Sequence, residues 1–130
     1  MNFKKIIKSI SLGIAICACV STGVQAGQSN LLTYTGTDIW DWRTINDFSL
    51  SSSQNVTVYH SQTRNTASSS TYLNVDVRKY AFVGSTSQFE QHFTGNDSGT
   101  FSGNLSKGKY FLRFKSSVKA QKFDIDGSVY

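Results

Sequence analysis

Hydrophobic and polar residues alternate in short runs along the chain, and turn-forming residues separate the runs. The clearest run is TYLNVDVRKY (71–80), in which Leu73, Val75 and Val77 point to one side and the polar residues between them to the other. This two-residue period is that of a β-strand with one dry face and one wet face. Other runs of similar character occupy residues 30–35, 55–60, 88–93, 101–105, 109–116 and 121–130.

These runs predict an all-β fold, because no segment after the first 26 residues has a helical period. About eight or nine strands are enough for two packed sheets, so we expect a single antiparallel β-sandwich that is jelly-roll-like. The turn-forming residues 95–100 are expected to join 88–93 to 101–105 as a hairpin. The polar stretch SQTRNTASSS (61–70) is expected to be a mobile loop.

Two tryptophans lie one residue apart in the segment GTDIWDWRTINDFSL (36–50). If this segment is mostly extended, Trp40 and Trp42 share one side with Phe48 and Leu50, and the other side is mainly charged. This parity predicts that at least one tryptophan belongs to the core. A turn before Phe48 would break the register, and the tryptophans would then be free to form an exposed ligand platform.

The N-terminal residues 1–26 have the three parts of a secretory signal peptide. Lysines are followed by an apolar stretch over about 10–20 and by the small-residue cleavage site Val-Gln-Ala at 24–26. A bilayer span takes about 20 residues, so this stretch predicts cleavage rather than a transmembrane anchor. We expect a secreted protein whose mature domain is 27–130, with a lipoprotein anchored through Cys19 as the alternative. A short, lysine-tipped signal is typical of bacteria.

Removal of the signal peptide changes the composition of the chain. Both cysteines, Cys17 and Cys19, leave with it, so the mature domain has no disulfide and depends on its hydrophobic core. Three of the 13 cationic residues also leave, and the ten that remain face eight acids, a net charge of +2. So small an excess argues against nucleic acid as a partner. The cations concentrate in the C-terminal half, which favours an anionic polymer or surface, although solvated lysines are the simpler interpretation.

Residues able to carry out catalysis are few. Asp124 and Asp126 share a strand face about 7 Å apart, but that face is expected to be in water. His60 and His92 lie on different predicted strands, without a metal-binding spacing, and no GxSxG nucleophile motif occurs. We therefore expect a protein that is not an enzyme and has no metal site or cofactor. A calcium site remains open as an alternative, with three candidate acidic ligands: Asp38, Asp41 and Asp97.

Aromatic and polar side chains offer the remaining candidate chemistry. In carbohydrate recognition, aromatic rings pack against the apolar face of a sugar while polar side chains bind its hydroxyl groups. For each ring the alternative is ordinary core or cross-strand packing. The candidate ligand-binding residues are Trp40, Trp42, Asp41, Arg43, Tyr59 and Tyr72.

The segment GTFSGNLSKGKYFLRFKSS (99–117) resembles the closing hairpin of bacterial pre-peptidase C-terminal domains, which are small extracellular β-sandwiches. Segment 46–60 is similar to the strands that precede it in that family. The resemblance implies a non-catalytic role in binding, targeting or stabilisation outside the cell. Such domains usually follow a catalytic module, which these residues do not contain, and many bind calcium through acids that have no counterpart here. The residues that carry the closing motif are Leu105, Gly108, Tyr110, Leu112 and Arg113.

The sequence thus predicts a secreted, non-catalytic binding module that docks on a cell-surface or matrix polysaccharide, or on a surface protein of the cell envelope. One alternative is a bacteriocin-like or toxin-like antagonist that acts on the envelopes of other cells. A second alternative is an extracellular matrix protein that self-associates through its strand edges. The ligand and the oligomeric state remain open.

Overall fold

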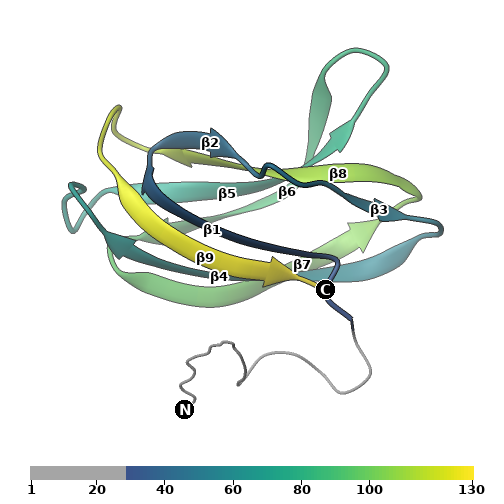
Figure 1. The fold of residues 1–130 in the computed structure, drawn as a ribbon, viewed down its shortest axis with the longest axis horizontal. Helices are drawn as coiled ribbons and strands as arrows, with labels where there is room; N and C mark the ends of the chain where they lie inside the picture. Colours follow the sequence, from purple (N-terminus) through teal and green to yellow (C-terminus); the bar gives the residue numbers. More distant parts are fainter. Residues whose placement is uncertain (1–28) are drawn as a thin grey trace. The chain divides into compact units, whose positions relative to one another are not determined.

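The structure, a computed structural model, describes residues 29–130, and the predicted signal peptide and the Cys19 anchor lie outside them. The described residues form strands and no helix, which confirms the prediction of an all-β fold (Figure 1). Accordingly, they contain no helix long and apolar enough to span a membrane. The strands are β1 (Leu32–Ile39), β2 (Asp41–Arg43), β3 (Phe48–Leu50), β4 (Gln54–Arg64), β5 (Tyr72–Tyr80), β6 (Ser85–Thr94), β7 (Asp97–Leu105), β8 (Gly108–Ser116) and β9 (Phe123–Val129).

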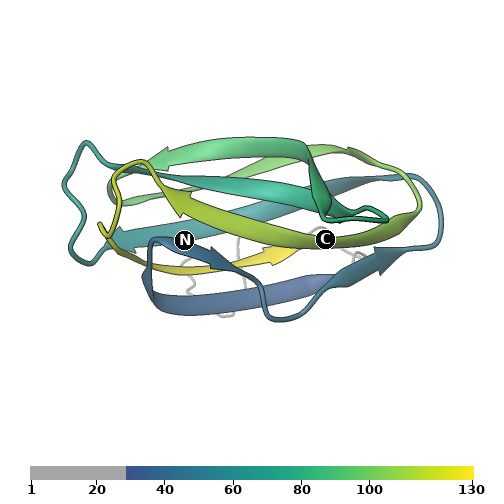
Figure 2. The same ribbon diagram turned by 90° about the horizontal axis from the view of Figure 1, so that it is seen from above.

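The strands form two antiparallel sheets that pack face to face, as predicted. The four-stranded sheet has the order β1-β9-β4-β7, and the five-stranded sheet has the order β2-β8-β5-β6, with β3 also paired to β8. Figure 1 shows the two layers nearly edge-on, and Figure 2 looks onto the five-stranded sheet. Because β2 and β3 pair with successive parts of β8, they act as one interrupted edge strand. This order is the double Greek key of a jelly roll.

Two local predictions are wrong. Segments 88–93 and 101–105 do not form a hairpin, because β6 belongs to the five-stranded sheet whereas β7 pairs with β4 in the four-stranded sheet. Glycine and asparagine reverse the chain direction, but they do not determine which sheet the next strand joins. The predicted loop 61–70 is also too long, because β4 continues to Arg64 and buries the side chain of Gln62.

The core lies between the inner faces of the two sheets. Leu73, Val75 and Val77 of β5 are fully buried, so the alternation read from the sequence is confirmed. Phe114 of β8 is also fully buried, and Trp42 packs against it. The other fully buried large side chains come from β4, β8, β9 and the end of β7: Val56, Val58, His60, Leu105, Tyr110, Leu112, Phe123 and Val129.

A chain of hydrogen bonds crosses this core. The Gln62 amide donates to the backbone carbonyls of Phe93 and Gly95 at 2.9 and 2.8 Å, so its Oε1 is left as an acceptor for His60 Nε2 at 2.9 Å. His60 Nδ1 therefore accepts from the Tyr34 hydroxyl, 2.8 Å away. Burial raises the pKa of Tyr34, which keeps its proton. The side-chain polar groups of Tyr34, His60 and Gln62 thus all have hydrogen-bond partners when His60 is neutral.

The two glycines that flank His60 in the sheet differ in the space around them. In the sheet, His60 lies between Gly99 of β7 and Gly127 of β9. A Cβ atom at Gly127 would be 2.2 Å from the Tyr59 carbonyl oxygen and 2.4 Å from the Tyr34 hydroxyl oxygen. A Cβ at Gly99 would meet only the Phe93 ring, at an ordinary 3.5 Å.

Acidification is expected to destabilise the fold through His60. Burial lowers the pKa of His60 from 6.5 to about 4, so between these values the unfolded chain binds a proton that the folded chain excludes. The contribution of neutral His60 is complete above pH 6.5 and is lost as the pH falls to 4, about 3 kcal/mol in all. Urea unfolding at successive pH values measures this loss, and a His92→Gln variant should retain it. An imidazole NMR resonance of His60 that titrates near pH 6.5 in the folded protein would contradict the assignment.

Alanine substitution of Gly127 and of Gly99 is expected to change the free energy of unfolding by different amounts. Gly127→Ala should lower the free energy of unfolding by about 1–3 kcal/mol, because the new methyl group collides with backbone and with the Tyr34 ring. Gly99→Ala, the matched control beside the same histidine, should change it by less than about 0.5 kcal/mol. Urea titrations of the two variants decide the point, and equal stabilities would refute the packing role of Gly127.

Candidate functional site

The outer face of the five-stranded sheet gathers polar and aromatic side chains from β2, β5, β6 and β8. Because Leu73, Val75 and Val77 point inward, the residues between them point outward, and strand pairing places partners from β6 and β8 beside them. This surface is called the polar face below. Its members are Asp41, Arg43, Tyr72, Asn74, Asp76, Arg78, Tyr80, Glu90, His92, Arg113 and Lys115.

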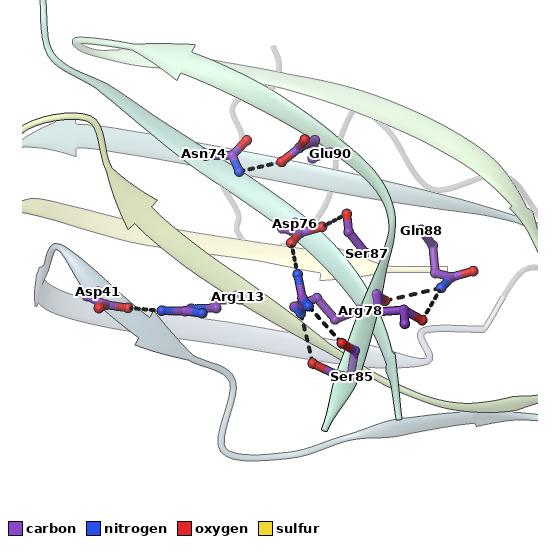
Figure 3. Close-up of polar contacts among 10 residues, drawn as sticks. Asp41, Asn74, Asp76, Arg78, Ser85, Ser87, Gln88, Glu90 and Arg113 are labelled. Carbon is purple, nitrogen blue, oxygen red and sulfur yellow. Dashed lines mark hydrogen bonds and ion pairs between the residues drawn. The ribbon is translucent and has the colours of Figure 1, made fainter. Parts of the chain in front are cut away.

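Asp76 lies at the centre of the polar face and is held by a hydrogen-bond network (Figure 3). Its carboxylate accepts from Arg78 Nη1 at 2.8 Å and from the Ser87 hydroxyl. Arg78 in turn donates to the Ser85 hydroxyl and carbonyl oxygens, both at 2.9 Å. Only 10% of the Asp76 side chain and 24% of the Arg78 side chain are exposed, so this pair is largely shielded from water. The network fixes four polar side chains of β5 and β6: Asp76, Arg78, Ser85 and Ser87.

An aromatic pair lies next to this network. The rings of Tyr72 and His92 stack with their centroids 4.1 Å apart and their planes 16° apart. Between this pair and Asp76, Asn74 donates to Glu90 Oε1 at 2.6 Å (Figure 3). The other atom of that amide, Asn74 Oδ1, is buried and has no hydrogen-bond partner among the described residues. An unsatisfied acceptor of this kind is uncommon in a folded protein.

A cation–aromatic cluster closes the other end of the polar face. Phe111 points outward from β8, yet it is buried because the Arg43 guanidinium lies 3.9 Å from its ring centroid and Tyr80 packs beside it at 4.9 Å. Asp47 joins these residues, accepting from Arg43 at 3.2 Å and from the Tyr80 hydroxyl at 3.0 Å. Lys109 lies 3.7 Å from the same carboxylate. Phe111 therefore points outward but is shielded from water by Arg43 and Tyr80.

The six predicted ligand-binding residues are divided among four locations. Asp41 and Arg43 of β2 and Tyr72 of β5 lie on the polar face, and Asp41 pairs with Arg113 at 3.0 Å. Trp42 points inward and stacks on Phe114 at 5.7 Å, which confirms that one tryptophan belongs to the core.

The other two predicted residues lie away from the polar face. Trp40 is partly buried between β1 and β2, where its carbonyl accepts from the Ser116 amide. Tyr59 lies on the outer side of β4 in the four-stranded sheet, and the structure does not bring it near Tyr72.

Two of the acidic residues considered for calcium or catalysis, Asp38 and Asp124, are hydrogen-bonded to Asn65. The Asn65 amide bridges Asp38 and Asp124, at 2.7 and 3.0 Å, on an exposed surface. Among residues 29–130, no three His, Cys, Asp or Glu side chains are grouped as metal ligands. His60 is buried in the core and His92 lies on the polar face, so the two histidines belong to different parts of the fold.

Sequence reasoning did not include Asp76, Glu90 and His92 among the site residues. The alternation in 71–80 already placed Asp76 on the outer side, but the neighbours of β5 could not be read from the sequence. Pairing with β6 brings Glu90 opposite Asp76 and His92 opposite Asn74. The signal that could have pointed to them is the polar run QFEQH (88–92), whose outward positions are all hydrogen-bonding residues.

The chain matches no protein-family model, and no curated protein is significantly similar to it. Function is therefore inferred from the geometry of the polar face.

Asp76 is expected to be important for stability, because Arg78 and Ser87 lose their partner when it is removed. Asp76→Ala should lower the free energy of unfolding by about 1–3 kcal/mol, the contribution expected from two hydrogen bonds to a buried carboxylate. Asp41→Ala removes an ion pair whose two side chains are 35% and 45% exposed, and should cost less than about 0.5 kcal/mol. Urea titration compares the two, and an equally small effect of both would contradict the network described above.

Proposed function

We propose that the protein is an exported, non-catalytic module that binds an extracellular polysaccharide along the polar face. The observation that carries this proposal is the stacked pair of Tyr72 and His92 beside the fixed Asn74–Glu90 and Asp76–Arg78 pairs. Sugar rings have apolar faces and hydroxyl-bearing edges, so aromatic rings next to planar polar groups suit them.

The rigidity of the polar face supports binding. A ligand that meets side chains already held in place does not have to offset the entropy of ordering them. Arg78 is fixed by Asp76 and Ser85, and Asn74 by Glu90. A ligand hydroxyl that reaches Asn74 Oδ1 would also satisfy the one acceptor left unpaired here.

The shape and charge of the polar face favour a long, acidic polymer over a single sugar. From Tyr72 to Arg78, β5 spans about 20 Å, and the polar groups follow it without interruption. Lys115 lies between Asp41 and Asn74 in the strand register, and no described acid is within ion-pair distance of it. The carboxylates of an acidic polysaccharide would find in Lys115 and the half-exposed Arg113 two accessible cations.

Affinity electrophoresis and pull-down with a panel of neutral and acidic polysaccharides test this proposal. Tyr72→Ala should weaken retention by about tenfold, the loss expected for one stacked ring. Tyr59→Ala is the matched control, since it removes a tyrosine from the outer face of the other sheet. Equal losses in the two variants, or retention on no member of the panel by the unmodified protein, would overturn the proposal.

A further inference from the structure

The tip of the β5–β6 hairpin exposes two apolar side chains. Phe82 is 104% exposed and Val83 is 83% exposed, although large hydrophobic side chains of this size are usually buried. They occupy the centre of a tight turn in which the Ala81 amide donates to the Gly84 carbonyl at 3.0 Å. Gly84 has a φ of 74°, a conformation that glycine adopts without strain. The turn therefore holds the two side chains out in water.

The hairpin stands clear of the rest of the fold. Figure 1 shows it bending away from the sheets, on the outer side of the five-stranded sheet. The bend follows an irregularity in the pairing of β5 and β6 between Val77 and Arg78, and bulges of this kind turn strands out of the sheet. Phe82 and Val83 thus lie at the end of a projecting element, not in a groove.

Cations from β5, from β8 and from the turn between β7 and β8 lie at the base of this hairpin. The stretch VRKYAFVGSTSQF (77–89) has two cations and no acid. Lys79 Nζ donates to the Ser106 hydroxyl at 2.8 Å, which places the following residue, Lys107, beside the hairpin base. Lys109 lies over the Tyr80 ring at 5.7 Å. Arg78 is paired with Asp76, and Lys109 also lies 3.7 Å from Asp47. Lys79, Lys107 and Lys109, called the basic collar below, thus lie at the base of a hairpin with an apolar tip.

We propose that this tip inserts Phe82 and Val83 into an anionic lipid bilayer. Apolar side chains enter the boundary between headgroups and acyl chains, while nearby lysines are attracted to anionic headgroups. A protein partner would have to bury about 800 Å² on this side, and two side chains at a convex tip cannot supply such an area. A bilayer needs no complementary groove. This inference does not depend on polysaccharide binding.

Vesicle flotation of the full chain tests the proposal. With vesicles that contain phosphatidylglycerol, the double variant Phe82→Ser/Val83→Ser should bind about tenfold more weakly than the unmodified protein. Val118→Ser is the matched control, because Val118 is an exposed apolar residue beyond the end of β8, at the opposite end of β5 from the hairpin. It should not change binding. The N-terminal segment is the same in all three proteins, so its contribution cancels in the comparison.

A site-specific fluorophore keeps the test decisive if the N-terminal segment itself binds lipid. Cys17 and Cys19 are replaced by serine, and an environment-sensitive NBD label is attached at Phe82→Cys or at Val118→Cys. Anionic vesicles should shift the emission of the label at position 82 to the blue and leave the label at 118 unchanged, with a smaller shift for phosphatidylcholine alone. No shift at 82 would overturn the proposal. A shift at 82 without vesicles that grows with protein concentration would instead identify a second copy of the chain as the occupant, and would also overturn it.

Discussion

The buried hydrogen-bond chain from Tyr34 through His60 to Gln62 is the constraint on which the sandwich depends. It links β1 and β4 of the four-stranded sheet to the end of β6 in the five-stranded sheet, since Gln62 donates to the carbonyls of Phe93 and Gly95. Buried polar groups are costly unless all are paired, so the two sheets are held at one separation. The register of β9 is fixed as well, because a side chain at position 127 would collide with the Tyr34 ring and the Tyr59 carbonyl. If β9 slipped by one residue, a residue with a side chain would take the position of Gly127.

Because side chains alternate along a strand, fixing the inner faces also determines which residues lie on the outer faces. The two outer faces differ in charge. Among the described strands, those of the four-stranded sheet have Arg64 as their one cation, whereas those of the five-stranded sheet have six cations and three acids. The basic character of the chain is therefore concentrated on one side of the sandwich. On that side the hydrogen-bonding groups of β5 and β6 are already ordered before any ligand arrives.

The hairpin and the polar face lie on the same side of the sandwich. The bend after Val77 raises the tip on the outer side of the five-stranded sheet, where Asp76 and Arg78 lie (Figures 1 and 3). A bilayer that received the tip would therefore face the polar face. The two proposals are compatible if the polysaccharide is attached to, or lies close to, a lipid surface. Each can fail separately, because Tyr72 is at one end of β5 and Phe82 is beyond the other end.

The sequence by itself determined the fold class and the inward positions of most strands. Alternation in 71–80 predicted the buried side chains of β5, and parity in 36–50 placed Trp42 with Phe48 on the inner side. Side-chain direction within a strand depends only on the two-residue period, a local property. In 36–50 the inward positions continue past a bend at 45–46, because β2 and β3 both pair with β8. Only the tertiary structure decided which strands are neighbours. It separated β6 from β7, combined β2 and β3 along β8, and brought Glu90 and His92 beside β5. Strand pairing joins residues far apart in the chain through backbone hydrogen bonds that are the same for every sequence, so a local pattern does not record it.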